Sequence, residues 1–485
     1  MVGAAELAHL DAGDQAALVA RREVKPVELV EAAIERIEAL NPTLNAVVAT
    51  AYDQALDAAR AMPVDDTRPF AGVPFLLKDL ITEAAGMPFT EGSRFLRDHV
   101  STHDQELVVR LRRAGFVILG KTNTPEFGTA PHCEPRLFGP TRNPWDLERS
   151  TAGSSGGSAA AVASGMVPAA HANDLGGSIR YPASCCGLFG LKPTRGRVPL
   201  GPEYADPCGA MAVEHAVTRS VRDSAAILDA IAGPELGEPF PAPPLARPLR
   251  DEVDQPVGTL RIAFSAEAAD GHPTDPVCVT ALDEAVRLCD SLGHHLEERW
   301  LPPLRPEVGE AIGTFWGGAV SWIVEYWIRK VGRQPGPDEL EPLTRVFWEG
   351  GRGTSAGDYL LALEELRRYS REVAAFFQEV DVWLTPTLAQ PPPLLGEMQS
   401  DDADPMAGLR RSSQFVAFPG IVANITGNPA MSVPLHWSPA GLPIGVHALG
   451  RFGDEATLIR LAAQLEQAQP WATRRPPVHA ATPPS

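Results

Sequence analysis

Two clusters of glycine and serine carry the residues best suited to chemistry. Residues 154–158 read SSGGS and residues 176–178 read GGS, and an alanine-rich segment long enough for one helix and one strand separates them. Glycines beside serines allow positive φ and leave peptide N–H groups uncovered. Because the second cluster opens a predicted helix over 179–185, these N–H groups favour an anion. That anion is either a bound phosphate or the oxyanion of an acyl transfer with Ser178 as nucleophile.

A lysine interrupts the apolar run that we expect to form a nearby strand. Residues 73–81 read VPFLLKDLI, which predicts a buried strand containing Lys78 and Asp79. Burial disfavours the charged form of lysine. The run alone leaves two interpretations open: Lys78 stands at the strand end and reaches solvent or pairs with Asp79, or it is a buried catalytic base.

A serine nucleophile needs a base, and histidine is the common one. The chain has 12 histidines, and residues 153–157 formally spell GxSxG with Ser155 at the centre. That motif requires a strand running into a sharp turn, whereas residues 143–152, NPWDLERSTA, are polar and turn-like. The sequence context therefore argues against a Ser-His-Asp triad on Ser155.

Taken together, the motifs resemble those of the amidase signature family of serine hydrolases. The matching segments cover nearly the whole chain: GVPFLLKDL at 72–80, LGKTNTPEFG at 119–128, LFGPTRNPWD at 137–146, GSSGGSAAAVASG at 153–165, DLGGSIRYPAS at 174–184, GLFGLKPTRGRVP at 187–199 and GLPIGVHALGRFGDEATLIRLA at 441–462. These motifs are long and follow one another in order, so chance agreement is an inadequate explanation.

The resemblance implies an α/β fold with a central mixed, twisted β-sheet covered on both faces by α-helices. Length alone favours two or more domains for 485 residues, but the resemblance implies one domain over 1–485. Within it we expect an N-terminal helical layer over 1–65 and a core with the catalytic residues over 70–235. A second part of the core over 257–470 would include a variable helical region, 306–379, that lines the substrate funnel.

The resemblance also implies a Ser-Ser-Lys relay. Ser178 would be the acyl nucleophile, Ser154 the bridging serine that follows a cis peptide bond, and Lys78 the base, neutral when the reaction starts. The oxyanion hole would consist of the backbone N–H groups of Leu175, Gly176, Gly177 and Ser178. Many relatives have threonine or glycine at position 175, so we expect Leu175 to affect substrate preference rather than activity.

Other residues are expected to support this site. Asp174 and Arg180 would pair across the turn and hold it. Gly128 and Thr129 lie in a loop that borders the acyl pocket in relatives, although a plain surface loop is an equal alternative. The aromatic residues of 306–379 are more often core than ligand cage, but an aromatic wall of the funnel that includes Trp316 is the functional alternative.

Hydrophobic periodicity and turn residues predict the remaining elements. Helices are expected over residues 4–62, with a stop at Asn41-Pro42, and over 276–292 and 454–467. The segment 104–121 predicts a helix, a stop at Gly115 and a strand. Further strands are expected at 260–266, 380–387 and 442–450, together with the segment 424–435, and the proline-rich residues 234–256 predict an extended linker.

Composition excludes several classes of partner. The formal net charge of −19 argues against nucleic acid and anionic membranes, which need clustered Lys and Arg. The six cysteines form no CxxC pair, which favours free thiols in a reducing compartment.

With no secretory signal and no membrane span recognisable, we expect a cytoplasmic protein. No metal motif is apparent, the relay needs no metal or cofactor, and the resemblance implies a homodimer.

Three functions fit the sequence. The first is an amidohydrolase that cleaves an acylamide, anilide or oligoamide, because the signature segment is similar to the branch of aminohexanoate cyclic-dimer hydrolases and aryl-acylamidases; a carbamate (urethane) hydrolase with the same relay is its nearest alternative. The second is the glutamine-hydrolysing A subunit of a tRNA-dependent amidotransferase. The third is a non-catalytic binding protein, against which the presence of all three relay residues argues.

Overall fold

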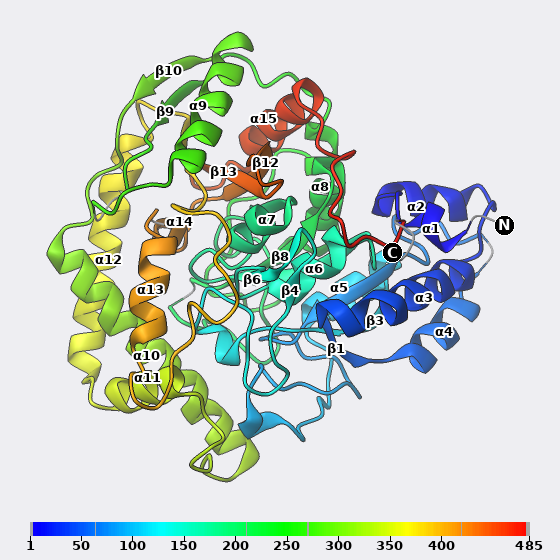
Figure 1. The fold of residues 1–485 in the computed structure, drawn as a ribbon, viewed down its shortest axis with the longest axis horizontal. Coiled ribbons are helices and arrows are strands. Elements are labelled where there is room, and N and C mark those ends of the chain that lie inside the picture. Colours follow the sequence, from blue (N-terminus) through cyan, green and yellow to red (C-terminus); the bar gives the residue numbers. More distant parts are fainter. Residues whose placement is uncertain (1–2, 64, 210, 269–270, 419, 482–485) are drawn as a thin grey trace.

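The computed structural model describes residues 3–63, 65–209, 211–268, 271–418 and 420–481. One large sheet contains the strands β1 Val47–Thr50, β2 Pro74–Lys78, β3 Val117–Thr122, β6 Ala169–Asp174, β7 Phe189–Lys192, β8 Val213–Thr218, β9 Arg261–Phe264, β10 His295–Glu298, β11 Val382–Pro386, β12 Ala430–Trp437 and β13 Pro443–Gly450. Their order in this mixed, 11-stranded sheet is β1-β3-β2-β6-β8-β7-β12-β13-β11-β9-β10 (Figure 1). Strands β4 Arg142–Asn143 and β5 Asp146–Ser150 form a separate pair.

Helices cover both faces of the large sheet. They are α1 Ala4–Leu7, α2 Ala12–Ala20, α3 Pro26–Leu44, α4 Tyr52–Arg60, α5 Glu106–Ala114, α6 Gly156–Ala163, α7 Arg180–Cys186, α8 Val221–Ile231, α9 Pro276–Ser291, α10 Pro306–Val331, α11 Pro342–Arg352, α12 Ala356–Phe376, α13 Ala407–Phe415, α14 Gly420–Thr426 and α15 Glu455–Ala468. One core unites apolar residues of α5, α8, α9 and α15 with the sheet, a second those of α3, α4, α6 and α7, and a third those of α10, α12 and α14. The predicted fold class is confirmed.

The carboxyl ends of three parallel strands meet at one edge of the sheet. Strand β2 lies between β3 and β6 and runs parallel to both. These strands end at Lys78, Thr122 and Asp174. In α/β sheets the crevice beyond such ends is the usual place for a ligand. The fold therefore brings residues that lie far apart in the sequence to one edge.

Two predictions for the N-terminal region were wrong. Residues 4–62 are not all helical, because β1 lies within them and pairs antiparallel with β3. Helix α3 does not stop at Asn41-Pro42 but continues to Leu44, and Asn45 ends it in the left-handed region with φ 50°. The side chain of Asn41 accepts hydrogen bonds from the N–H groups of Ala46 and Val47, both at 2.8 Å, which fastens this helix end to β1.

Most other elements lie where the sequence predicted them. Helix α5 ends at Gly115, whose φ of 103° suits glycine, and β3 follows. Residues 306–376 contain the three helices α10, α11 and α12, which lie together on the left of Figure 1. The expectation of a turn at 143–152 was wrong, because β5 runs through it and pairs with β4. Among the helices that the structure describes, none has the length and hydrophobicity needed to cross a bilayer.

Candidate active site

Lys78, the last residue of β2, is fully buried. Its Nζ lies 2.6 Å from Oγ of Ser154 and 2.5 Å from Oδ1 of Asn173, so it does not reach solvent. Burial lowers the pKa of Lys78 to about 7, although the nearby Glu214 carboxylate opposes this shift. Near pH 7 much of the amine is therefore uncharged. In that state it can donate to Asn173 and accept the hydroxyl proton of Ser154.

A buried polar network surrounds this lysine. Burial lowers the pKa of His171, which favours the neutral form of its ring. Its Nδ1 accepts the backbone N–H of Lys78 at 3.1 Å, which leaves the ring proton on Nε2, in contact with Glu214. Asn173 donates from Nδ2 to the backbone oxygen of Leu80 at 3.0 Å and to Glu214 at 3.4 Å. Both sides of the Asn173 amide are thus fixed, which orients its oxygen toward Lys78.

Sequence reasoning missed these network residues. His171 and Asn173 are two residues apart on β6 and therefore share one face of the strand. This alternation of polar residues in HAND, directly before Leu175, was the available signal for both. Glu214 stands on β8, which is adjacent to β6 in the sheet but distant in the sequence. The local sequence around Glu214 therefore does not predict its contact with His171 and Asn173.

Ser154 stands just before α6, and the peptide bond between Gly153 and Ser154 is cis, as the resemblance implied. A Cβ atom on Gly153 would lie 2.4 Å from the backbone oxygen of His132. A residue with a side chain would therefore clash with the backbone at this position, and only glycine fits. The neighbouring Ser155 is fully buried, and its Oγ donates to the backbone oxygen of Asn173 at 3.3 Å. That hydroxyl is engaged with the backbone, which argues against Ser155 as a nucleophile.

Ser178 lies in the turn between β6 and α7 and is partly exposed. It lines the same pocket as Ser154. Asp174 holds the turn by accepting the N–H of Gly177 at 2.8 Å and that of Ile179 at 3.1 Å. Gly177 has a φ of 132°, in the region that favours glycine. The structure therefore brings Ser178, Ser154 and Lys78 to one place from three different elements.

Asp174 and Arg180 form a fully buried ion pair across this turn. The guanidinium donates from Nε at 3.0 Å and from Nη2 at 2.9 Å to the two carboxylate oxygens. The side-chain amide of Asn424 donates from Nδ2 to Oδ1 of Asp174 at 3.0 Å. Its oxygen accepts from Nη2 of Arg180 at 2.9 Å. Burial alone would raise the pKa of Asp174, but the charge of Arg180 and these hydrogen bonds hold it well below its usual range.

The predicted oxyanion hole needs one correction. The N–H of Gly177 already donates to Asp174, so it is turned toward that side chain rather than free for a substrate. Within the part of the chain that the structure describes, the N–H groups of Leu175, Gly176 and Ser178 have no acceptor. Leu175, Gly176 and Ser178 also line or adjoin the pocket. Three N–H groups without an acceptor therefore remain beside the pocket, and groups of this kind can stabilise an oxyanion.

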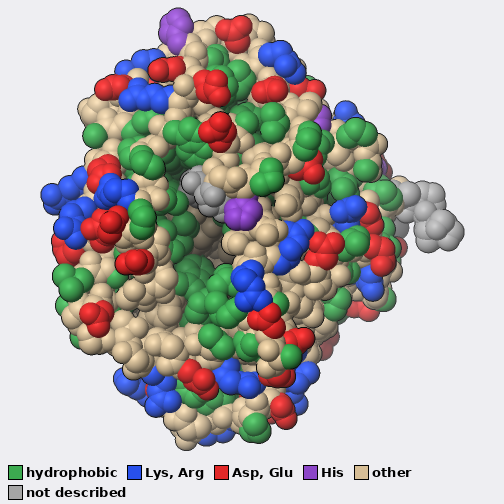
Figure 2. Space-filling model, turned by 60° about the vertical axis from the view of Figure 1, so that its left-hand side comes forward, with side chains coloured by type: hydrophobic (Ala, Val, Ile, Leu, Met, Phe, Trp, Pro, Cys, Tyr) green, Lys and Arg blue, Asp and Glu red, His purple; other side chains and the backbone are tan. Residues whose placement is uncertain are grey.

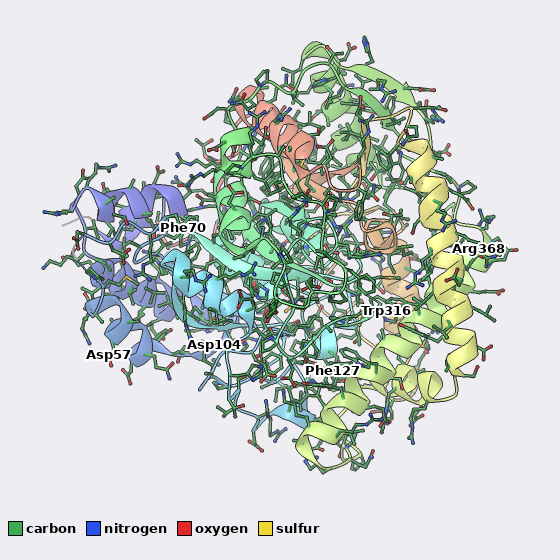
Figure 3. All side chains as sticks on the ribbon, turned by 180° about the vertical axis from the view of Figure 1, so that it is seen from behind. Asp57, Phe70, Asp104, Phe127, Trp316 and Arg368 are labelled. Carbon is green, nitrogen blue, oxygen red and sulfur yellow. The ribbon has the colours of Figure 1, made fainter. Side chains whose placement is uncertain are left out.

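The three predicted substrate contacts all line the pocket. Gly128 and Thr129 come from the loop after β3, and Trp316 comes from α10. In Figure 3, Trp316 and Phe127 are labelled near each other in the lower right part of the view, beside the yellow-green helices. Figure 2 shows a hollow in the face on this side, with hydrophobic side chains along its walls. The pocket is lined by Leu80, Ile81, Glu91, Phe127, Gly128, Thr129, Ser154, Asn173, Asp174, Leu175, Ser178, Tyr204, Pro207, Cys208, Ala212, Trp316, Ala319, Val320, Trp322 and Ile323.

The aromatic residues of 306–379 divide between the two predicted roles. Trp316 and Trp322 line the pocket, as a funnel wall would. Phe315, Trp327 and Phe377 are buried in the core. Within the described residues no group of three or more His, Cys, Asp or Glu side chains is arranged to hold a metal ion.

Comparisons with known proteins agree with this geometry. The family model described as "Amidase" matches residues 28–459. The chain is 36% identical over 478 residues to the 6-aminohexanoate-cyclic-dimer hydrolase of Paenarthrobacter ureafaciens, with 96% of each chain covered. A solved structure of a 6-aminohexanoate cyclic dimer hydrolase matches with a TM-score of 0.92 and 36% identity, covering 97% of this chain and 99% of that one.

More distant solved structures match as well. A bacterial aryl acylamidase of the amidase signature enzymes has a TM-score of 0.86 at 27% identity, with 96% of this chain and 97% of that chain covered. The corresponding component of the glutamyl-tRNA(Gln) amidotransferase from Thermotoga maritima has a TM-score of 0.76 at 28% identity, with 98% of both chains covered. The family model and the relatives above 30% identity leave one conclusion: the chain belongs to the amidase signature family, hydrolases that act on carbon–nitrogen amide bonds.

Proposed function

We propose that the protein hydrolyses a carboxylic amide, of the acylamide, anilide or oligoamide type, through an acyl-enzyme on Ser178. The observation that carries this proposal is the 2.6 Å contact between Lys78 Nζ and Ser154 Oγ beside a pocket that Ser178 also lines. A lysine with a pKa of about 7 is poised to act as a base at neutral pH. The similarity to the cyclic-dimer hydrolases and the aryl acylamidase supports the amide class.

The residues suggest a two-step acyl transfer. Ser178 Oγ attacks the carbonyl carbon and gives its proton to Ser154 Oγ, while Ser154 gives its own proton to Lys78 Nζ. The oxygen that becomes negative faces the N–H groups of Leu175, Gly176 and Ser178. The proton then returns through Ser154 to the leaving nitrogen, and the carbon–nitrogen bond breaks. Water attacks the resulting ester by the same relay and releases the carboxylate.

A panel of substrates tests the proposed class. It comprises an aliphatic amide, an anilide, an aminohexanoate oligomer, an aryl carbamate and glutamine, with amine or ammonia release as the measurement. Cleavage of the first three supports the proposal, and the best of them defines the substrate class. Preference for the carbamate would indicate a urethane hydrolase. If only glutamine reacts, the amidotransferase function replaces our proposal.

The pH dependence of kcat/KM should reflect the titration of Lys78. Only the uncharged amine can accept the proton of Ser154, and the pKa of this amine is about 7. We therefore expect kcat/KM to be low at pH 5, to rise through a single ionisation near pH 7 and to level off above pH 8, since this parameter reports ionisations of the free enzyme. Initial rates at low substrate concentration over pH 5–9 measure this. A profile that is flat, or that falls between pH 6 and 8, contradicts a lysine base.

Substitution of Glu214 should shift this profile. Its carboxylate favours the charged form of Lys78, so Glu214→Gln should lower the pKa of the lysine further and move the midpoint to lower pH by roughly one pH unit. Glutamine keeps one acceptor oxygen, which can serve His171, and it loses the oxygen that accepts from Asn173 at the longer distance of 3.4 Å. The measurement is the kcat/KM profile of both proteins. A lower plateau with an unmoved midpoint would show that Glu214 only supports the fold.

The family resemblance also leads us to propose a cytoplasmic homodimer. The molar mass in solution tests the oligomeric state, and cell fractionation tests the location. Neither property is needed for the chemistry, because the proposed relay lies within one chain.

A further inference from the structure

Basic side chains gather where the two ends of the chain meet, toward the right of Figure 1. His9, which follows α1, stacks on His479 near the C-terminal end, with the ring centroids 6.0 Å apart. Arg219, which follows β8, donates to the backbone oxygens of Ala8 and Leu10. We call this group the basic cluster, and it comprises His9, Arg36, Arg219, Arg474, Arg475 and His479.

The basic cluster has no carboxylate in contact with it. Within the described residues, none of its side chains forms an ion pair with Asp or Glu at 4.0 Å or less. Arg36 is only 3% exposed, and its guanidinium donates to the backbone oxygens of Ala4 at 3.1 Å and of Met166 at 3.1 and 3.3 Å. Burial and the charge of Arg219 lower the pKa of Arg36 to about 9, so positive charge is unfavourable here. Buried charges are nearly always paired, and this chain has 61 acidic residues against 42 basic ones, so an uncompensated cation calls for an anion.

The acids nearest to Arg219 are engaged elsewhere. Burial lowers the pKa of Arg219, and the charges of Asp223 and Asp11 oppose this shift only in part. Both oxygens of Asp11 accept from the guanidinium of Arg222, at 2.7 and 2.8 Å. The oxygens of Asp223 accept two backbone N–H groups at the start of α2, at 2.6 and 2.9 Å. These acids therefore reduce the charge of the basic cluster only from a distance.

The basic cluster lines a small cavity that shares no residue with the catalytic pocket. The cavity has a volume of about 20 Å³, and since roughly 10–15 Å³ is enough for one water molecule, it holds one particle of about that size. Its basic lining residues are Arg219, Arg474, Arg475 and His479, and no Asp or Glu among the described residues lines it. Burial and the charges of the arginines lower the pKa of His479 to about 3, so its ring is neutral. Nδ1 of this ring accepts the N–H of Ala481 at 3.1 Å, which leaves the ring proton on Nε2 as a further donor.

We propose that this cavity binds a small inorganic anion of the size of chloride. A guanidinium has five N–H donors, and Arg219 uses two of them for backbone oxygens, so donors remain for a ligand. A water molecule could accept from the same donors, but it would leave the repulsion among the arginines in place. A tetrahedral oxyanion such as sulfate is too large for the cavity. The anion would join the segment after α1 to the C-terminal segment and would stabilise the native state to which it binds.

Replacement of gluconate by chloride at constant ionic strength tests the site in the full chain. In about 100 mM sodium salt at pH 7, we expect chloride to raise the midpoint of thermal unfolding by at least about 2 °C, with a saturable dependence on its concentration. Gluconate is too large for the cavity and is more strongly excluded from protein surfaces, so a general salt effect would act in the opposite direction. An unchanged midpoint, or a larger saturable rise with sulfate than with chloride, overturns the proposal.

Substitution of Arg475 assigns the effect to the basic cluster. Arg475 is exposed, and its one hydrogen bond within the described residues is a long one, to His9 at 3.5 Å, so Arg475→Gln should fold normally. We expect this variant to lose at least about half of the chloride-dependent rise, because one guanidinium of the cavity is missing. Arg371→Gln, which removes an exposed arginine of α12 outside the cluster, should keep the full rise. Equal rises in Arg475→Gln and the wild type would overturn the site.

Crystals grown with bromide, which is close to chloride in size, provide a check that needs no variant. The anomalous signal should place one bromide ion in the cavity beside Arg219. An empty cavity at saturating bromide contradicts the proposal.

Discussion

Ser178→Ala should lower kcat on the best amide by at least about 10⁴-fold, because no acyl-enzyme can form without the hydroxyl. The remaining rate would come from substrate binding and from the uncovered N–H groups of Leu175, Gly176 and residue 178, since alanine keeps the backbone N–H at that position. Alanine fits the partly exposed turn, and Asp174 continues to hold it through the N–H groups of Gly177 and Ile179. We therefore expect unchanged thermal unfolding together with lost turnover, measured by amine release over hours at high enzyme concentration.

Ser155→Ala is the matched control. The substitution removes one hydroxyl from the neighbouring cluster, and that hydroxyl only donates to the backbone oxygen of Asn173. A change of less than about ten-fold in kcat is expected, since a single neutral hydrogen bond contributes about 1 kcal/mol. A large loss in Ser155→Ala with activity retained in Ser178→Ala would favour the GxSxG arrangement. It would also show that the Ser178 assignment is wrong.

The sequence predicted those parts of the fold that depend on local patterns. The alanine-rich segment between the two glycine–serine clusters contains α6 and β6, as expected. Helix α5 ends at Gly115, and α9 and β9 follow the proline-rich residues 234–256. In each case apolar periodicity and the conformational freedom of glycine or the rigidity of proline act within a few residues. Such signals survive without knowledge of the tertiary structure.

Strand pairing lies beyond such local signals. Strand β8 inserts between β6 and β7, although it follows both in the sequence. Strand β10 has the sequence HLEE, is mostly exposed at the sheet edge, and shows no buried face that a pattern could reveal. Strand β5 is polar, so its side chains do not indicate a strand, and only its pairing with β4 identifies it as one. These strands exist because a partner strand satisfies their backbone groups.

The same distinction applies to the site. Ser178 and Lys78 could be singled out because a glycine–serine motif and a lysine in an apolar run are visible in the sequence, whereas the relay roles, Ser154 and the pocket residue Trp316 came from the family resemblance. Glu214 could not be singled out, because it acquires its role only through burial beside residues distant along the chain. The correction at Gly177 has a similar origin. Its N–H looks free in the sequence, but the fold directs it to Asp174.

Arg180→Met should lower the free energy of unfolding by about 3–5 kcal/mol at pH 7, because it leaves the Asp174 carboxylate buried without its cation. Backbone donors at Gly177 and Ile179 and the Asn424 amide remain, and they keep the loss from being larger. Chemical denaturation at equilibrium measures the loss. Arg411→Met, in a partly exposed pair with Glu397, is the matched control and should cost less than about 1 kcal/mol.

The cost of Arg180→Met should also depend on pH in a defined direction. In the wild type, the pKa of Asp174 lies below its ordinary value of 3.8, so the ion pair contributes stability above that pH and loses it as the pH falls. Without Arg180, burial raises the pKa of the same carboxyl, so the variant becomes less stable as the pH rises. The difference between the two proteins should therefore be largest near pH 7 and shrink toward pH 4. Adding Asp174→Asn to Arg180→Met removes the unpaired charge and should recover part of the lost free energy of unfolding. If the difference in free energy between wild type and Arg180→Met is constant from pH 4 to pH 7, and the double variant recovers nothing, lost packing rather than the buried charge determines the loss.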